Sequence, residues 1–290
     1  MKRILVTGAN GYIGSHVANY LAQIPNIILT ATDFKNSRLN KNVMFVSEDI
    51  LRNADKEELY ERLKKPEICI HLAWQDGFVH NADSHIDKLP AHFHFLKNLV
   101  EHGCTQLLVA GSLREYGSVH GKISEDAPVK ADNYYAWSKI SLKNLLDIYL
   151  KDKPVCLQWL RFFTPYGNDE LNNSIFSKII AWEKEGRKTF PFTEGKEQYD
   201  YIHIDDLTHQ IAAVAAQTEI SGVINCCSGR PETLKSKVEE LIKSRNFKIR
   251  PEYGAFPSRS YDSDIIYGDN TKISKIMQLT GWRKKISPLE

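Results

Sequence analysis

A glycine-rich turn joins a short apolar run to an amphipathic segment near the N-terminus. Residues 4–7 are typical of a buried strand, and residues 12–22 are typical of a helix. Gly8, Gly11 and Gly14 lie between these two segments and at the start of the second. Glycines at this spacing, after a strand and at a helix start, are typical of a phosphate-binding βα unit. The first turn therefore predicts an α/β fold.

Apolar β-type runs alternate with helical patterns through the first half of the chain. The runs are almost continuously apolar, which fits strands buried on both faces of a parallel sheet. The predicted strands are residues 4–7, 27–32, 43–47, 68–74, 106–110 and 155–162, and the predicted helices are residues 12–22, 56–64, 91–102 and 135–151. This alternation predicts a Rossmann-type, doubly wound parallel sheet.

The pattern loosens after about Gly167, and a smaller lobe is expected there. Helices are predicted at residues 175–185, 205–217, 234–244 and 271–279, with a short strand at residues 201–204. We therefore expect a dinucleotide-binding domain over residues 1–167. Residues 168–290 are expected to form mainly a substrate-binding lobe, interleaved with returns to the sheet.

The charge balance excludes some classes of partner. The chain has 38 basic and 36 acidic residues, a net charge of +2, so neither a nucleic acid nor an anionic membrane is implied. No stretch is long and apolar enough to cross a membrane. The five cysteines lack zinc or redox spacing, and we expect reduced core thiols in a cytoplasmic protein without a metal site.

Each glycine of the first turn has its own expected role. Gly8 permits the tight turn, Gly11 lets the backbone approach a pyrophosphate, and Gly14 allows the helix to pack closely on the strand. The N–H groups at the helix start would face the phosphates. The expected cofactor contacts of this turn are Gly8, Asn10, Gly11, Tyr12, Ile13 and Gly14.

Acidic residues after the next two predicted strands bear on the choice of cofactor. Asp33 could accept hydrogen bonds from the adenosine ribose hydroxyls, which favours NAD. Lys35 and Arg38 follow closely and could instead receive the 2′-phosphate of NADP. Asp49, next to Ile50, could bind the adenine amino group or could serve only as a loop or capping carboxylate. The sequence thus favours NAD and leaves NADP open.

Three residues further along the chain predict proton transfer beside the cofactor. Ser112 follows the predicted strand at residues 106–110, and Tyr135 and Lys139 are one helical turn apart. A free tyrosine has a pKa of about 10, and a nearby ammonium favours its phenolate. Tyr135 could then exchange a proton with a substrate oxygen while Ser112 hydrogen-bonds the same atom. The preceding Tyr134 lacks this spacing to the lysine, so Tyr135 is the predicted acid/base.

Nearly the whole chain resembles the extended short-chain dehydrogenase/reductases, in particular their nucleotide-sugar epimerase and reductase branch. The similar segments, in family order, are Gly8–Gly14, His71–Ala73, Ser112–Gly117, Tyr135 with Lys139, Leu160–Gly167, Tyr201–Asp206, and Arg259 with Asp262. The resemblance implies a Rossmann fold, a nicotinamide cofactor and a nucleoside-diphosphate sugar as substrate.

The resemblance also implies further contacts. Leu72 and Ala73 would line the cofactor site, and Lys139 would also hold the nicotinamide ribose. The implied substrate-binding residues are Arg114, Thr164, Arg259 and Asp262, with Arg259 directed at the pyrophosphate. His92 stands where an asparagine is common in the family, or it is simply a histidine on the helix surface.

Departures from the family narrow the expected reaction. Leu113 and Arg114 occupy the places of the Asp-Glu pair that sugar 4,6-dehydratases carry, so water elimination has no evident acid/base agent. The Ser112–Gly117 turn is similar to that of some 4-keto-6-deoxyhexose reductases. Reduction at C4, in deoxysugar biosynthesis, is therefore the favoured activity.

Two other functions stay open at this point, and so does the state of assembly. A 4-epimerase with tightly held NAD would use the same serine, tyrosine and lysine. A non-catalytic dinucleotide sensor is disfavoured, because such proteins typically lose the Tyr/Lys pair. The resemblance further implies a homodimer that pairs through the predicted helices 91–102 and 135–151.

Overall fold

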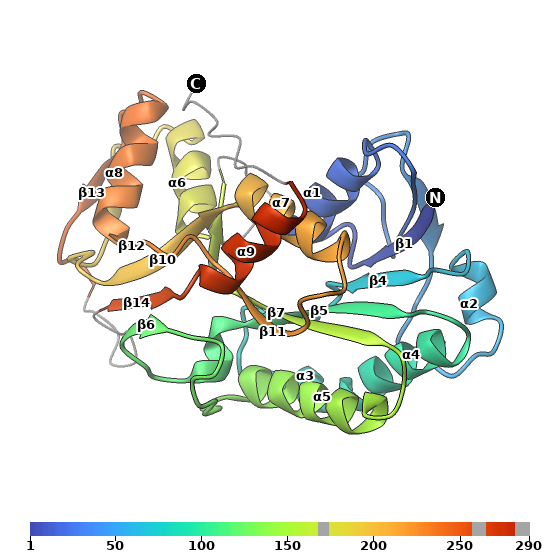
Figure 1. Cartoon of the computed structure of the whole chain (residues 1–290). Helices are drawn as coiled ribbons and strands as arrows, with labels where there is room; N and C mark the ends of the chain where they lie inside the picture. Colours follow the sequence, from blue (N-terminus) through green and yellow to red (C-terminus); the bar gives the residue numbers. More distant parts are fainter. Residues whose placement is uncertain (168–173, 257–264, 282–290) are drawn as a thin grey trace.

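The larger part of the molecule is built on one seven-stranded parallel sheet (Figure 1). The computed structural model describes residues 1–167, 174–256 and 265–281. The strands follow the order β11-β7-β5-β4-β1-β2-β3. Their bounds are β1 Lys2–Thr7, β2 Ile27–Asp33, β3 Met44–Ser47, β4 Ile68–His71, β5 Gln106–Ser112, β7 Cys156–Phe162 and β11 Gly222–Cys226. The predicted doubly wound sheet is confirmed.

Helices cover both faces of this sheet (Figure 1). One face packs against α1 (Tyr12–Leu21), α7 (Ile204–Ala215) and α9 (Thr271–Leu279), and the other against α2 (Leu59–Arg62), α4 (Leu89–Glu101) and α5 (Tyr134–Leu150). Successive residues of β1 alternate between the two cores: Ile4 and Val6 belong to the first and Leu5 to the second. This two-residue period is that of a strand buried on both faces.

A smaller lobe lies beside the main sheet (Figure 1). Its mixed sheet has the order β12-β10-β14-β6, with β8 also paired to β10. The bounds are β6 Gly121–Ile123, β8 Thr164–Tyr166, β10 Gln198–His203, β12 Pro231–Thr233 and β14 Ile265–Gly268. A two-stranded pair of β9 (Thr189–Pro191) and β13 (Arg250–Glu252) joins α6 (Ile175–Lys184) and α8 (Leu234–Ser244) around an aromatic core.

Two predicted elements were too long. The strand predicted to reach residue 74 ends at His71, and the next three residues leave the ladder to line a pocket. The helix predicted over residues 56–64 is the short α2, which ends before Lys64 and Lys65. Both lysines have positive φ angles, 67° and 53°, that a right-handed helix cannot contain.

The strand order places a crevice where ligands bind in such sheets. The connection from β1 runs outward to β2 and β3, whereas β4, on the other side of β1, leads to β5. The loops that follow β1 and β4 therefore diverge at the carboxyl ends of adjacent strands, and this switch point is the usual ligand site. Among the described residues, no helix combines the length and the apolar character that a membrane crossing needs.

Candidate active site

A pocket of about 850 Å³ opens at the switch point. It is formed by the carboxyl ends of β1, β2, β3 and β4 and by the start of α4. Most of the residues predicted to bind the cofactor line it: Gly8, Gly11, Asp33, Asp49, Ile50, Leu72 and Ala73. A cavity of this size lies within the range of small-molecule and cofactor sites.

In the glycine turn, two backbone segments approach so closely that side chains would not fit between them. Gly8 has a φ of 65°, and a Cβ on Gly14 would lie 2.1 Å from the Gly8 carbonyl oxygen. Helix α1 then starts after Gly11 with neither a side-chain cap nor an acidic residue in its first turn. Its first N–H groups are therefore available to an anion, as the diphosphate of a dinucleotide requires.

Asp33 is fixed at the end of β2 by two backbone donors. One carboxylate oxygen accepts from the Asn10 N–H at 2.9 Å, and the other accepts from the Phe34 N–H at 2.7 Å. A carboxylate has about four acceptor positions, so two remain for ribose hydroxyls. Lys35 and Arg38 do not line the pocket. The donor and acceptor groups present here therefore fit NAD.

The close contacts in the turn predict different effects for two alanine substitutions. Gly14→Ala should lower both stability and NAD affinity, because its Cβ would overlap the Gly8 backbone. Gly11→Ala meets only the Gly8 oxygen at 3.1 Å, so it should keep the fold and lose NAD affinity at least tenfold. Thermal unfolding and NAD titration of both variants test this, and unchanged NAD affinity in Gly11→Ala would contradict it.

The predicted catalytic residues converge next to this pocket. Ser112 is the last residue of β5, and Tyr135 lies in the first turn of α5. That helix begins where the Asn133 side chain accepts from the Ala136 N–H at 2.9 Å, an N-cap that fixes its starting residue. The Ser112 side chain is close enough to the Tyr135 hydroxyl to lower its pKa.

Burial, rather than a neighbouring charge, dominates the acidity of this tyrosine. It raises the pKa of Tyr135 to about 12, although the Ser112 side chain and the charge of Arg114 act in the opposite direction. Lys139, which we expected to favour the phenolate, has its Nζ 5.7 Å from the centre of the Tyr135 ring and donates to the Ala110 carbonyl oxygen. With a pKa of about 12, Tyr135 is a neutral phenol at neutral pH and can donate a proton.

Lys139 is buried among apolar and aromatic groups. Its Nζ donates to the Ala110 carbonyl oxygen at 2.7 Å and lies 3.6 Å from the centre of the Trp74 ring. Burial lowers the pKa of Lys139 to about 7, while the charge of Glu115 raises it. The side chain thus titrates near neutral pH.

Buried histidines complete the wall behind Lys139. His71 bridges the Thr7 hydroxyl and His92, with both distances 2.9 Å, and His92 stacks on Trp74 with centroids 4.4 Å apart. Because His92 is only 1% exposed, the alternative that it lies on the helix surface is wrong. Burial lowers the pKa of His71 to about 3 and that of His92 well below its usual range.

A buried carboxylate that sequence reasoning missed supports Ser112. Glu115 is fully buried and accepts from the Ser112 N–H at 2.8 Å, from the Trp159 indole at 3.0 Å and from the Arg161 Nε at 2.8 Å. The available signal was the capping-box spacing of Ser112 and Glu115. Trp74, directly after the His71–Ala73 motif, was also missed.

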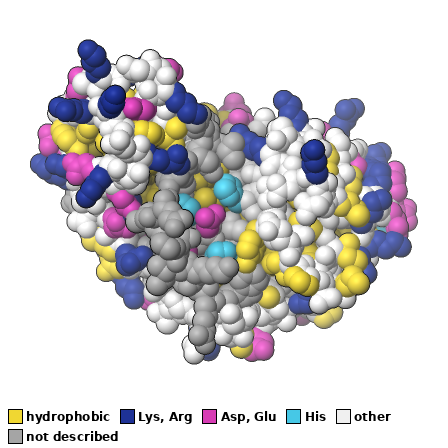
Figure 2. Space-filling model, turned by 90° about the horizontal axis from the view of Figure 1, so that it is seen from above, with side chains coloured by type: hydrophobic (Ala, Val, Ile, Leu, Met, Phe, Trp, Pro, Cys, Tyr) yellow, Lys and Arg dark blue, Asp and Glu magenta, His cyan; other side chains and the backbone are white. Residues whose placement is uncertain are grey.

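The predicted substrate contacts are only partly placed. Arg114 lines a small hollow with Asp132 and Tyr199 where the two lobes meet, and Thr164 begins β8 beside β10. Arg259 and Asp262 lie outside the described residues. Seen from above, histidine and acidic side chains lie in the hollow between the lobes, with Lys and Arg scattered around it (Figure 2).

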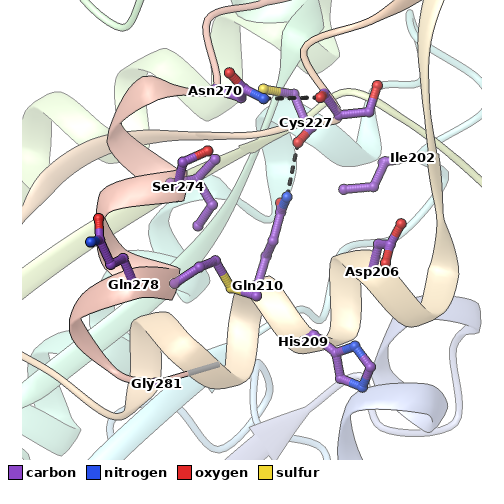
Figure 3. A pocket seen from close by; sticks show the side chains of 12 residues that line it. Ile202, Asp206, His209, Gln210, Cys227, Asn270, Ser274, Gln278 and Gly281 are labelled. Atoms are coloured by element: carbon purple, nitrogen blue, oxygen red, sulfur yellow. Dashed lines mark hydrogen bonds between the residues drawn. The ribbon is translucent and has the colours of Figure 1, made fainter. Parts of the chain in front are cut away.

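A second pocket, of about 500 Å³, lies between α7 and α9. Figure 3 shows Gln210 directed toward Cys227, whose carbonyl oxygen accepts from the Gln210 side chain at 2.8 Å. None of Ser112, Tyr135 and Lys139 lines this pocket, so it is separate from the predicted chemistry. Within residues 1–167, 174–256 and 265–281, no group of three His, Cys, Asp or Glu side chains could hold a metal ion.

A dinucleotide turn followed by a Ser/Tyr/Lys set on one parallel sheet defines a nicotinamide-dependent oxidoreductase class. The chain belongs to the NAD dependent epimerase/dehydratase family, whose model matches residues 4–227. The predicted family is thereby confirmed.

Individual relatives are similar over nearly their full length. The chain is 37% identical to dTDP-6-deoxy-L-talose 4-dehydrogenase (NAD(+)) of Aggregatibacter actinomycetemcomitans, over 91% of this chain and 98% of the relative. It is 26% identical to dTDP-4-dehydro-6-deoxyglucose reductase of Escherichia coli, over 98% and 93% respectively.

Solved structures share the fold. The UDP-glucose 4-epimerase of Thermotoga maritima with UDP-glucose has a TM-score of 0.82 and 22% identity, covering 98% of this chain and 94% of its own. The UDP-glucuronic acid 4-epimerase of Bacillus cereus, in complex with UDP-glucuronic acid and NAD, has a TM-score of 0.78 and 23% identity, with coverages of 98% and 95%.

Proposed function

We propose that this protein transfers hydride between NAD and C4 of a nucleoside-diphosphate 6-deoxyhexose, reducing the 4-keto sugar and, in reverse, oxidising the 4-hydroxyl. The observation that carries the proposal is the proximity of Ser112 and Tyr135 beside the dinucleotide pocket: Ser112 lowers the pKa of Tyr135, whose ring contacts Trp74 of the pocket wall. The 37% identical relative is named as a 4-dehydrogenase of a dTDP-6-deoxyhexose with NAD(+), and the reductase relative is named for a 4-dehydro-6-deoxy sugar.

The side chains divide the proton chemistry between them. NAD, when bound, supplies or accepts the hydride. Tyr135, held as a neutral phenol, donates its proton to the C4 oxygen during reduction, and Ser112 donates a hydrogen bond to the same oxygen. Because Glu115 fixes the Ser112 backbone, the hydroxyl is held in place before substrate arrives.

Water elimination lacks an agent at this position. Leu113 and Arg114 directly follow Ser112, and neither can act as a carboxylic acid or base. The nearest carboxylate along the chain, Glu115, is fully buried and occupied by the donors of Trp159 and Arg161. This arrangement supports hydride transfer alone. Arg114 is proposed to contact the sugar or its diphosphate, as are Thr164, Arg259 and Asp262.

The reaction is tested by mixing purified protein with dTDP-, GDP-, CDP- and UDP-linked 4-keto-6-deoxy sugars and NADH or NADPH. We expect one equivalent of NADH to be oxidised per sugar reduced, with a dTDP sugar the best substrate. No cofactor consumption with any sugar, together with interconversion of UDP-hexoses without added cofactor, would establish an epimerase and overturn the proposal.

We further propose that two copies pair through α5. Its outer face exposes Trp137 (49%), Leu145 (39%) and Ile148 (76%), which lie on one side of the helix. Such an apolar stripe is typical of a helix that packs against a partner.

The proposed pairing predicts that an acidic residue introduced on the outer face of α5 prevents dimer formation. Ile148→Asp should convert a dimer into a monomer, because a buried carboxylate without a partner opposes association. Light scattering on the wild type and the variant measures this, with Ile28→Asp, an exposed residue of β2, as a control that stays dimeric. A monomeric wild type would contradict the proposed pairing.

A further inference from the structure

Trp74 occupies the position where the dinucleotide pocket meets the catalytic helix. It follows β4 by three residues and lines the pocket. Its indole is fixed by two histidines: the Nε1–H donates to His85 Nδ1 at 3.0 Å, and the ring stacks on His92 with an interplanar angle of 14°. The orientation of the indole is therefore set by the protein before any ligand binds.

The indole also lies against both of the catalytic side chains on α5. The Lys139 Nζ lies 3.6 Å from the ring centroid, which is well inside the range of a cation–π contact. The Tyr135 ring meets the indole edge-on at 6.2 Å. The indole face, the Ala110 carbonyl oxygen and the negative charge of Glu115 together compensate the burial of this ammonium.

We propose that Trp74 is a positioning residue for Lys139: its indole, clamped by His85 and His92, holds the ammonium beside Tyr135 at the edge of the dinucleotide pocket. The kinetic consequence of this inference rests on the proposed function, whereas the contact between Trp74 and Lys139 can be tested without it.

Several other charged or titratable groups surround Lys139 and Tyr135 and bear on the pH dependence of this contact. Burial lowers the pKa of His71 to about 3 and that of His92 well below its usual range, whereas Lys139 titrates near pH 7. The charged or titratable groups packed around Lys139 and Tyr135 are His71 of β4, His80 and His85 before and within α3 (Ser84–Asp87), His92 of α4, and Arg114 and Glu115 of the 3-10 turn η1 (Leu113–Tyr116).

The contact is tested first without substrate, by the intrinsic fluorescence of the protein between pH 6 and pH 9. We expect a step near pH 7, because an ammonium against the indole face changes its emission. The step should vanish in Lys139→Met and in Trp74→Phe. It should persist in Trp182→Leu, which removes a tryptophan of the smaller lobe that also carries a cation–π contact. A step that survives in Lys139→Met would arise from another group and would overturn the proposal.

The kinetic consequence is tested by the pH profile of kcat/KM for sugar reduction. Activity that needs the Lys139 ammonium falls as pH rises through the lysine pKa. Removing the cation–π contact in Trp74→Leu disfavours the charged form, so this high-pH limb should move down by about one pH unit. Trp74→Phe keeps an aromatic face and should move the limb by less than half of that.

The outcomes separate the inference from the proposed function. If Trp74→Leu lowers kcat equally at every pH and leaves the limb in place, the indole is only a packing group and the proposal fails. If the wild type reduces no nucleotide sugar but shows the fluorescence step, the proposed function fails while the assignment of Trp74 is supported.

Discussion

Tyr135→Phe is expected to lower kcat for sugar reduction by about 10³-fold while leaving NAD affinity nearly unchanged. The variant keeps the ring and its contact with Trp74 but loses the hydroxyl that lies beside Ser112. Proton transfer by a positioned side chain contributes about 10²–10⁴-fold to a rate, so its removal falls in this range. Steady-state kinetics and NAD titration measure the two quantities.

Tyr134→Phe is the matched control. It removes a hydroxyl from the neighbouring residue, whose side chain is 46% exposed, and turnover should stay within about twofold of the wild type. Wild-type turnover in Tyr135→Phe, or loss of turnover in Tyr134→Phe alone, would show that Tyr135 is not the acid/base.

The raised pKa of Tyr135 also predicts a difference between the two directions of the reaction. Reduction needs the phenol, which persists up to about pH 12, so the tyrosine imposes no limit on reduction in the neutral range. Oxidation needs the phenolate, whose fraction grows about tenfold for each pH unit below the pKa. We therefore expect kcat/KM for oxidation to rise between pH 5 and 6, where Lys139 stays protonated, and that for reduction to stay flat.

The fold and the cofactor turn could be predicted from the sequence because their signals are local. The glycine spacing and the apolar runs of β1, β4 and β5 each act within a few residues. The last strand of the main sheet, β11, could not be assigned in this way, since Gly222–Cys226 is five residues long and pairs with β7 more than 60 residues earlier in the chain. Only the tertiary structure brings the two together.

The catalytic residues could be predicted from spacing, but their surroundings could not. The charge of Lys139 was expected to act on the tyrosine, but the sequence could not show that its Nζ lies against the Trp74 ring and donates to the Ala110 carbonyl oxygen. A glutamate is seldom fully buried, so the pattern gave no reason to place Glu115 in the core. Its role depends on Trp159 and Arg161, which lie more than 40 residues away in the sequence.

Glu115→Gln is expected to lower the free energy of unfolding by about 3 kcal/mol or more. The carboxylate receives only donors: Ser112 N–H on one oxygen, Arg161 Nε on the other, and the Trp159 indole on both. Either orientation of a glutamine would turn its NH₂ toward one of these donors, and Arg161, which is 3% exposed, would lose its counter-charge. Urea denaturation measures the loss.

Glu185→Gln provides a control with the same geometry in water. Glu185 accepts from Arg187 Nε at 2.8 Å, as Glu115 does from Arg161, but both side chains of this pair are more than half exposed. Exposed pairs contribute about 0–1 kcal/mol, so this variant should be almost as stable as the wild type. Equal losses in the two variants would show that burial is not the cause. A large loss in Glu115→Gln alone, with a fall in kcat, would show that the ion pair holds both the core and the Ser112 turn.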